Sequence, residues 1–361
     1  MTDLQTSAAE QDRTSDLLAA VQAAVAAGQP LQIIGGGSKA AYGRPGTGEP
    51  IALAGHCGIV AYDPAELVVS VRAGTPLRAV SAALAAEGQM LAFEPAEYDG
   101  RATVGGMVAC GLSGPRRPWA GAVRDFVLGC RLISGEGKLL RFGGEVMKNV
   151  AGYDVSRLIT GSLGCLGLIT EVSFKVLPLP RLQASLRLEL SLDEALDRLA
   201  HWGQQPLPLA GACHDGEGLW LRLEGGESSV QAACAQLGGE RVEADFWRRL
   251  REQELEFFRS PLPLWRLSVA PDSRPQFSGL HPGQQLADWG GAQRWLKTDA
   301  EPAQLRTLAA AAGGHASCFT AGVVDSPFHP LPAPLLHYHQ QLKARLDPLR
   351  IFNRGRMYAE L

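Results

Sequence analysis

The sequence predicts an α+β protein of two domains, and three observations lead to this class. The chain has 361 residues, and common domains have about 150 residues. Of its 42 glycines, 25 fall between Gly35 and Gly167, so the two halves differ in construction. After Pro180 the apolar pattern becomes a β-α-β-β-α series, typical of an α+β domain with an antiparallel sheet. We expect domains over 1–180 and 181–331, and a C-terminal helix and tail over 332–361 that returns to the first domain.

The composition excludes several classes of protein. Lys and Arg number 34 and Asp and Glu 37, so a net charge of −3 gives no general attraction to nucleic acid or acidic membranes. The seven cysteines form no CxxC pair, which argues against a disulfide framework or a metal or iron–sulfur site. The first residues have no basic start before an apolar core, and the long uncharged runs contain glycines and polar residues. We expect a cytoplasmic protein with no membrane span, whose membrane contact, peripheral to the inner membrane, is made through partners.

In the first half, apolar periodicity and turn residues predict helices and short strands. A helix over 16–27 ends at Gly28, and a buried strand follows it. Thr75 as N-cap, Pro76 at the first helical position and Gly88 as stop predict a second helix. The strands are expected over 31–34, 59–62, 67–72, 126–134, 138–142 and 168–177, with the fourth and fifth forming a hairpin.

In the second half, Ser191 and Glu194 form a capping box that opens a helix. Further helices are expected over 228–237, 245–258, 302–312 and 332–346. Strands are expected over 184–190, 207–213, 219–223 and 265–269. No fixed-period repeat is visible.

A glycine loop follows the first strand: Ile33 and Ile34 run into Gly35, Gly36, Gly37, Ser38 and Lys39. Main-chain N–H groups in such a loop, with a cation beside them, can hold a pyrophosphate. The alternative is an ordinary turn. The loop matches neither G-x-G-x-x-G nor the P-loop pattern, so nicotinamide and P-loop nucleotide sites lack their signatures.

Five further motifs follow the glycine loop in order. They are 71–76 (VRAGTP), 94–95 with 103–109 (EP, TVGGMVA), 125–129 (DFVLG), 148–154 (KNVAGYD) and 161–170 (GSLGCLGLIT). As an ordered set over about residues 31–180, they resemble the FAD-binding domain of the vanillyl-alcohol-oxidase/PCMH-type flavoproteins. Within that superfamily, the segments 264–269, 288–295 and 347–358 resemble the E subunits of bacterial glycolate oxidases, over nearly the whole chain.

The resemblance implies a PCMH-type two-subdomain FAD-binding fold, with the second domain a ferredoxin-like α+β cap. It implies that the glycine loop and the Gly105-Gly106 turn bind the FAD diphosphate, and that 164–169 lies against the flavin. Small residues suit a ring packed on main chain, and a cation suits reduced flavin. The expected cofactor-binding residues are Gly35, Gly36, Gly37, Ser38, Lys39, Gly74, Thr103, Gly105, Gly106, Lys148, Gly164, Gly167 and Ile169.

Some relatives attach flavin through a histidine just after the glycine loop. Here Ser38 and Lys39 occupy that place and the nearest histidine is His56, so we expect non-covalent FAD. Arg116, Arg117 and Arg124 are further candidates for positive charge near the flavin, the alternative being solvated surface cations.

No catalytic residue is identified. Related D-2-hydroxyacid dehydrogenases carry a His-x-Gly-Asp-Gly-Asn-type cluster, whereas this chain has only His214-Asp215-Gly216-Glu217-Gly218. We therefore interpret His214 as a turn or core residue. His337 and His339 lie two positions apart on a predicted helix and face different sides, so no metal site is expected.

These observations predict an FAD-binding subunit of a complex that oxidises glycolate to glyoxylate. By the resemblance, its partners are a second FAD-containing subunit and an iron–sulfur subunit that carries electrons onward. The alternatives are a stand-alone FAD-dependent 2-hydroxyacid dehydrogenase and an assembly subunit with a silent flavin site. The segment 289–295, with Trp289, Arg294 and Trp295, is a candidate partner surface; alternatively both tryptophans fill the second domain's core.

Overall fold

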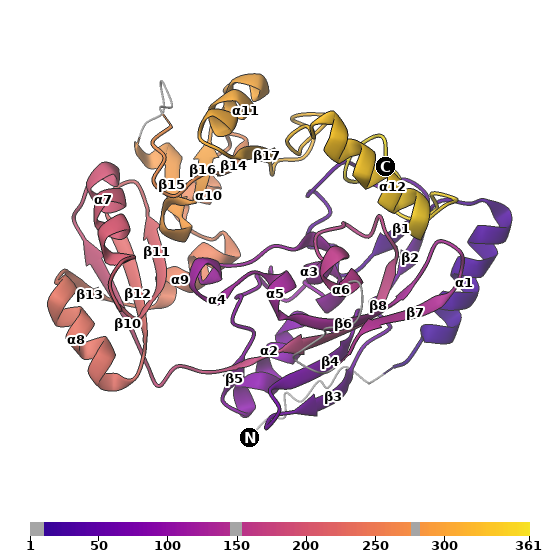
Figure 1. The fold of residues 1–361 in the computed structure, drawn as a ribbon, viewed down its shortest axis with the longest axis horizontal. Helices are drawn as coiled ribbons and strands as arrows, with labels where there is room; N and C mark the ends of the chain where they lie inside the picture. Colours follow the sequence, from indigo (N-terminus) through magenta and orange to yellow (C-terminus); the bar gives the residue numbers. More distant parts are fainter. Residues whose placement is uncertain (1–10, 145–153, 276–281) are drawn as a thin grey trace.

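The computed structural model describes residues 11–144, 154–275 and 282–361. Two antiparallel sheets organise this part of the chain, one of five strands and one of eight (Figure 1). None of the helices in these ranges is both long and apolar enough to span a bilayer. Helices and sheets therefore both contribute, as an α+β class requires.

The first part of the chain packs helices and short strands around the five-stranded sheet. Helix α1 (Thr14–Ala27) buries Leu17 and Val21 and ends at Gly28, whose φ of 62° gives the left-handed cap that glycine favours. Strand β1 (Leu31–Ile34) pairs in parallel with β2 (Glu49–Ala52). The five-stranded sheet has the order β3 (Ile59–Asp63), β4 (Val68–Arg72), β8 (Leu168–Lys175), β6 (Val127–Ile133) and β7 (Leu139–Gly143). The remaining elements are α2 (Leu77–Ala86), α3 (Val104–Cys110), α4 (Arg117–Ala120), α5 (Val123–Phe126), α6 (Val155–Leu158) and the short pair β5 (Gln89–Met90) and β9 (Leu177–Pro178).

The start of α2 differs from the sequence prediction. Pro76 is the N-cap rather than the first helical residue, and no side chain caps the helix. The Thr75 hydroxyl accepts a hydrogen bond from the N–H of Gly58 (2.9 Å) and donates to the carbonyl of Arg72 (2.7 Å). Thr75 therefore ties the end of β4 to the segment before β3, because a buried hydroxyl takes the partners nearest to it.

The eight-stranded sheet repeats one topology. Strands β10 (Leu182–Leu188), β11 (Leu209–His214), β12 (Leu219–Gly225) and β13 (Glu240–Val242) lie in the order 4-1-3-2 of a ferredoxin-like unit. Strands β14 (Leu264–Ser268), β15 (Gln285–Asp288), β16 (Gln293–Lys297) and β17 (His315–Cys318) lie in the same order. The halves join where His214 of β11 meets Ala287 of β15. This repetition is one of topology, so a search for sequence periods does not find it.

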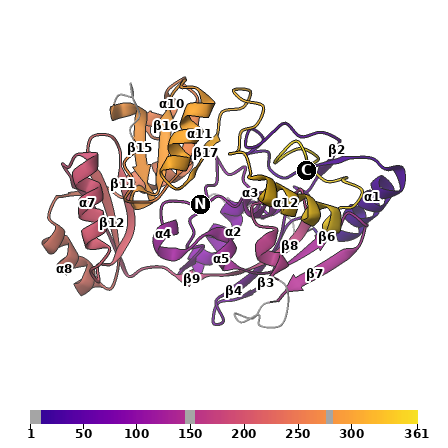
Figure 2. The same cartoon turned by 45° about the horizontal axis from the view of Figure 1, so that its top comes forward.

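Helices cover both faces of this sheet (Figures 1 and 2). On the outer face, α7 (Leu192–Trp202) and α8 (Glu227–Leu237) pack on the first half and α11 (Pro302–Ala311) on the second. On the inner face, Phe246 and Trp247 of α9 (Asp245–Glu252) pack with Trp295, and α10 (Glu256–Arg259) follows. The sequence predicted one helix over 245–258, but the structure has two. Gln253 ends α9 in the left-handed region, with φ of 61°. Two short 3₁₀ turns, η1 (Pro282–Gln284) and η2 (Trp289–Gly291), flank β15.

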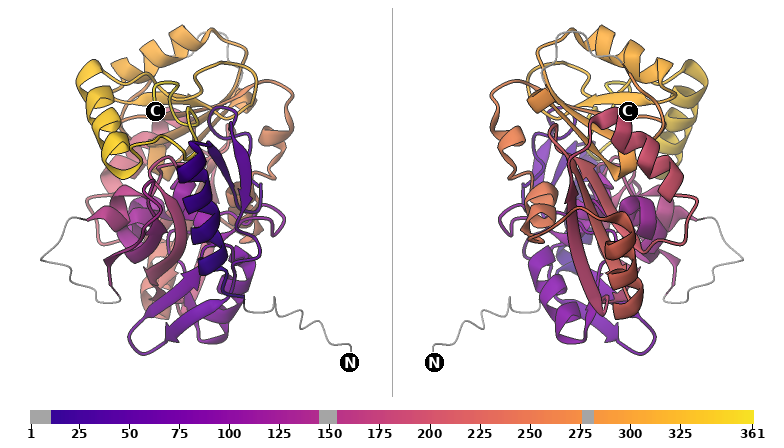
Figure 3. Two further views of the ribbon diagram at one scale, coloured as in Figure 1. Left: turned by 90° about the vertical axis from the view of Figure 1, so that its right-hand side faces the viewer. Right: turned by 90° about the vertical axis from the view of Figure 1, so that its left-hand side faces the viewer.

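The end of the chain lies against the first part, as Figures 1 and 3 show in yellow. After α12 (Ala333–Leu346), Leu31 of β1 donates to the carbonyl of Ile351 (2.6 Å) and accepts from the N–H of Asn353 (3.0 Å). The buried Lys343 ammonium donates to Asp347 (2.6 Å) and to the carbonyls of Cys165 and Phe352 (both 2.7 Å). Because the Lys343 ammonium is buried and uses its hydrogen bonds within the protein, and because the tail also bonds to Leu31, the tail is fixed to the strand that leads into the glycine loop.

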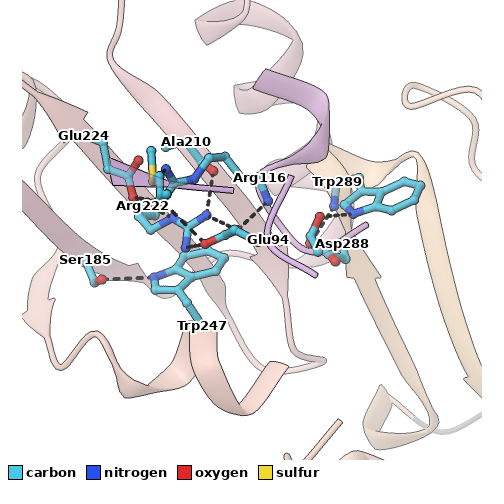
Figure 4. A network of polar contacts seen from close by, with 11 residues as sticks. Glu94, Arg116, Ser185, Ala210, Arg222, Glu224, Trp247, Asp288 and Trp289 are labelled. Atoms are coloured by element: carbon cyan, nitrogen blue, oxygen red, sulfur yellow. Dashed lines mark hydrogen bonds and ion pairs between the residues drawn. The ribbon is translucent and has the colours of Figure 1, made fainter. Parts of the chain in front are cut away.

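A buried ionic network joins the eight-stranded sheet to the segment after β5 and the start of α4 (Figure 4). The Glu94 carboxylate, in the loop after β5, accepts from both terminal nitrogens of Arg222 on β12 (2.8 and 2.7 Å), and Arg116 donates to Glu224 (2.7 Å). Burial opposes the ionisation of Glu94, but Arg222 and Arg116 lower its pKa below the ordinary value. This network fixes the cap sheet over the loops that follow β5.

Candidate functional site

A cavity of about 250 Å³ opens beside the glycine loop, where β1, α3 and the C-terminal tail meet. Residues from segments far apart in the sequence line it, so only the fold brings them together. Eleven of the residues predicted from the sequence are among them: Gly35, Gly36, Gly37, Ser38, Lys39, Thr103, Gly105, Gly106, Gly164, Gly167 and Ile169.

The glycine loop presents unused hydrogen-bond donors to this cavity. Within the described residues, the main-chain N–H groups of Gly35, Gly36, Gly37 and Ser38 have no protein acceptor, although all four residues line the cavity. Consecutive free N–H groups form a concave site for an anion. The loop can therefore hold a group such as a diphosphate.

Two of these positions have no room for a side chain. A Cβ on Gly36 would overlap the carbonyl oxygen of Arg101, and one on Gly35 would lie 2.5 Å from the Thr103 hydroxyl oxygen. Glycine is required here because the loop is pressed against the segment that precedes α3. The close approach leaves the opposite side of the loop open to a ligand.

The residues Gly105 and Gly106 lie in the first turn of α3, so the predicted turn at this point is a helix. Gly105 donates its N–H to the carbonyl of Ala73 (2.7 Å), and Gly106 donates weakly to the N-cap hydroxyl of Thr103 (3.4 Å). Because both N–H groups already have partners, these glycines line the cavity as small residues. A Cβ on Gly105 would come within 2.7 Å of the Cβ of Ala73.

The segment around Gly164 is fixed by a residue that the sequence analysis did not single out. The Asn353 side chain accepts from the N–H of Ile33 (2.8 Å) and donates to the carbonyl of Leu163 (2.6 Å). Gly164 has φ of 72°, and a Cβ there would lie 2.7 Å from the amide nitrogen of Asn353. One tail residue thus sets the spacing between β1 and the loop before β8.

Arg356 performs a similar role on the other side of the cavity. Its guanidinium donates to the carbonyls of Lys39 (3.2 Å), Ala40 (2.9 Å) and Tyr42 (2.8 Å), and also to that of Arg44. Burial lowers its pKa, yet a guanidinium stays charged at neutral pH. Arg356 therefore both shapes the loop and adds positive charge to the cavity. The motif over 347–358 contained both tail residues and was the signal that could have identified them.

Other predicted positions lie elsewhere. Gly74 does not line the cavity: it donates to the carbonyl of His56 (2.9 Å), and a Cβ would overlap the carbonyl oxygen of Leu53. Lys148 lies outside the described residues.

The three candidate arginines are not at the cavity. Arg116 is buried in the network with Glu94 and Glu224, so it is neither a surface cation nor a cavity residue. Arg117 lies over the ring of Trp289 (4.4 Å to the centroid). The side chain of Arg124 is 66% exposed.

The histidine and the two tryptophans that the sequence analysis singled out in the second domain are all buried. His214 is buried, with Nε2 2.9 Å from the carbonyl oxygen of Leu190, which confirms its interpretation as a core residue. Trp289 and Trp295 are also buried, and Arg294 is 1% exposed. The segment 289–295 as a partner surface is therefore wrong, because these side chains fill the protein's own interior.

Comparisons with known proteins agree with this geometry. Residues 9–143 match the family model described as FAD binding domain. The chain is 58% identical over 352 residues to glycolate oxidase subunit GlcE of Escherichia coli (strain K12), covering 98% of this chain and 99% of that protein. It is 32% identical over 142 residues to glycolate oxidase subunit GlcD of Bacillus subtilis (strain 168), covering 39% of this chain and 29% of that protein.

Among solved structures, alkyldihydroxyacetonephosphate synthase aligns with a TM-score of 0.67 at 15% identity, covering 95% of this chain and 75% of that one, which shows the shared fold. The cavity fits FAD: free N–H groups and cations can hold a diphosphate, and glycines leave space for a flat ring. The chain is an FAD-binding member of the oxidoreductase family that contains glycolate oxidase subunit GlcE.

Proposed function

We propose that the chain is the FAD-binding subunit of a complex that oxidises glycolate to glyoxylate. The observation that carries this is the 58% identity, over 98% of the chain, to a protein named as a subunit of glycolate oxidase. Bound FAD supplies the two-electron acceptor chemistry that removal of hydrogen from a CH–OH group requires. This chain contributes the cradle that holds the cofactor and orients it.

Within this proposal, the FAD diphosphate lies on the N–H groups of Gly35 to Ser38, and the segment from Gly164 to Ile169 borders the flavin. The free donors of the loop support the first assignment, and the left-handed backbone at Gly164 supports the second. We assign Lys148 and Gly74 as further residues of the cofactor site. Gly74 would contribute indirectly, through its close packing against Leu53.

FAD is held without a covalent bond in this proposal. Among the described residues that line the cavity there is no histidine, and burial raises the pKa of the lining thiol, Cys110, which makes it a weak nucleophile. Acid precipitation of the purified protein should release all of its flavin into the supernatant. Flavin that stays with the precipitate would contradict this part of the proposal.

The partners proposed are a second FAD-containing subunit and an iron–sulfur subunit, with the complex in the cytoplasm and in contact with the inner membrane through those partners. Among the described residues no group of His, Cys, Asp and Glu side chains could hold a metal ion. In this proposal, electrons leaving this flavin pass to a centre on another chain.

Co-expression with both expected partners tests the assignment. The chain should co-purify with them, and the mixture should reduce a dye when glycolate is added. Full-rate glycolate-dependent reduction by this chain alone would favour a stand-alone dehydrogenase instead. Co-purification without flavin in this chain would favour a structural subunit.

A further inference from the structure

Helix α12 lies at the edge of the molecule and buries very little of its surface (Figure 3). Of its 14 residues only Lys343 is buried. Helices of this length are marginally stable by themselves in water, and in proteins they gain most of their stability by packing an apolar face. Because α12 has little such packing within its own chain, contact with another surface would stabilise it.

The exposed side of α12 carries large side chains at helical spacing. Leu335 is 48% exposed, Tyr338 is 60% exposed, and the half-buried Leu342 follows four residues later. Residues at positions i, i+3 and i+7 share one face of a helix. Leu349, in the turn after the helix, is 50% exposed as well. The helix therefore presents an apolar face to its surroundings.

The charge around this face is positive. Helix α12 contains no Asp or Glu. Arg345 lies seven residues after Tyr338, and so on the same face; it is exposed and, in the part of the chain that the structure describes, forms no ion pair. Beyond the helix, the exposed Arg350 and Arg354 donate to backbone carbonyls rather than to carboxylates. Such a surface favours a partner that brings carboxylates.

This chemistry favours another protein over a second copy of this chain or a lipid surface. A second copy would present the same helix, again without a carboxylate, so like charges would meet. Helices that lie on membranes have a polar face rich in Lys and Arg, whereas Gln340 and Gln341 occupy that place in α12. Tyr338 and Arg345 are of the residue types enriched in the hot spots of protein interfaces.

The inner side of α12 contacts the wall of the cofactor cavity. The Lys343 ammonium donates to the carbonyl of Cys165 (2.7 Å), and the preceding residue, Gly164, lines that cavity. An α-helix with its side chains is about 10–12 Å across, so a protein on the outer side of α12 would lie about one helix width from this wall. Because electron transfer through protein slows steeply with distance, this position suits a subunit that carries electrons onward.

We propose that the exposed face of α12, with Leu335, Tyr338 and Arg345, is the docking surface for the iron–sulfur subunit of the complex. The matching surface on that subunit would be an apolar patch bordered by carboxylates. This inference rests on the proposed function, and it goes further in assigning the part of this chain that meets a particular partner.

The first test is photo-cross-linking in the complex formed by the full chain and both expected partners. Benzoylphenylalanine in place of Tyr338 should cross-link to the iron–sulfur subunit on irradiation. The same residue in place of Leu179, which is 46% exposed in a different part of the fold, should give no such product. A cross-link from position 338 to the second FAD-containing subunit or to another copy of this chain, or none in an assembled complex, would overturn the proposal.

The second test is the affinity of the full, FAD-loaded chain for the purified iron–sulfur subunit, measured by interferometry. Arg345→Glu should weaken binding at least about tenfold, since the charge facing the partner is reversed, and Arg345→Lys should retain most of the affinity. Arg198→Glu, at an exposed arginine of α7, is the matched control and should bind like the wild type. Equal FAD contents would show that all variants are folded.

The outcomes separate this surface from the proposed function. If Arg345→Glu binds as tightly as the wild type and its complex oxidises glycolate, the docking surface is overturned and the proposed function stands. If the variant loses the partner but the wild-type complex does not oxidise glycolate, the surface stands and the proposed function fails. A folded wild type that binds neither partner would overturn both.

Discussion

At the scale of single residues, Gly36 is the position where the sequence and the structure agree most closely on what a substitution would do. Gly36→Val adds a branched side chain where a Cβ already overlaps the carbonyl oxygen of Arg101, so the loop must move and its N–H groups lose their alignment. We expect FAD content to fall at least about tenfold while the far-UV circular dichroism remains that of a folded protein.

Gly226→Val is the control for this variant. Gly226 has an ordinary extended backbone, and a Cβ there would come no nearer than 3.8 Å to another atom. It should keep full FAD content. A folded Gly36→Val protein with full FAD occupancy would remove the loop from the site.

Asp288 predicts a dependence of stability on pH. Its pKa in the folded protein is raised to about 7 from an ordinary value of 3.8, mainly by burial. The folded state therefore holds the proton more tightly, and this stabilisation is complete below about pH 4 and lost as the pH rises through 7. Between pH 5 and 8, urea unfolding should show the wild type losing at least about 1 kcal/mol relative to Asp288→Asn.

The exposed Asp299 supplies the comparison, since Asp299→Asn should leave the wild-type pH profile unchanged. If Asp288→Asn follows the wild type across the same range, the raised pKa of Asp288 is not supported.

At the scale of elements, the C-terminal tail is part of the cofactor site. Arg356 donates to carbonyls of the segment after the glycine loop, among them those of Ala40 and Tyr42. Arg356→Ala removes these charge-assisted bonds, and we expect FAD affinity to fall by about 10- to 100-fold in a fluorescence titration. Arg354→Ala, a change at a neighbouring exposed arginine, should have little effect. Equal affinities for the two variants would show that the tail does not shape the loop.

Local signals predicted most elements, and they failed where tertiary contacts decide the structure. The capping box at Ser191 and the hairpin of β6 and β7 are confirmed, because both depend on residues close in sequence. The helix α3 was not predicted, because its glycines are poor helix formers. Glycine suits this helix only in the folded chain, where Gly105 lies against Ala73 with no room for a side chain. Asn353 and Arg356 reach the cavity from the far end of the chain, a contact that no spacing rule predicts.

At the scale of the whole molecule, the ionic network of Glu94, Arg116, Arg222 and Glu224 holds the cap sheet against loops of the first part. Arg222→Met leaves the Glu94 carboxylate buried without its bidentate partner, with only the N–H of Arg116 (2.9 Å) and the longer contact to the Arg116 guanidinium (3.5 Å). Breaking a buried pair in this way costs about 3–5 kcal/mol, measurable as a fall in the free energy of unfolding. Arg248→Met, which removes a half-exposed arginine from an ion pair with Asp245, should change stability by less than about 1 kcal/mol. Similar effects in the two variants would argue against a stabilising role for the network.

The division into domains over 1–180, 181–331 and 332–361 remains our proposal for the whole chain. Three features of the fold support it: the eight-stranded sheet begins at Leu182, its last strand ends at Cys318, and the tail pairs with β1 at Leu31. For the first half of the cap, the β-α-β-β-α series predicted from the sequence agrees with the ferredoxin-like order. The repetition of this order in the second half was not predicted, because the sequence analysis expected only the strand over 265–269 there and none of β15, β16 and β17.

The most direct test of the account is the activity of the assembled complex when the flavin site of this chain alone is emptied. The complex should be prepared with the expected partners and either the wild-type chain or Gly36→Val, and flavin content and glycolate-dependent dye reduction should be measured on both. We predict that the variant still co-purifies, that the complex loses the flavin belonging to this chain, and that dye reduction falls at least about tenfold. Full dye reduction by a complex that lacks this flavin would contradict the account.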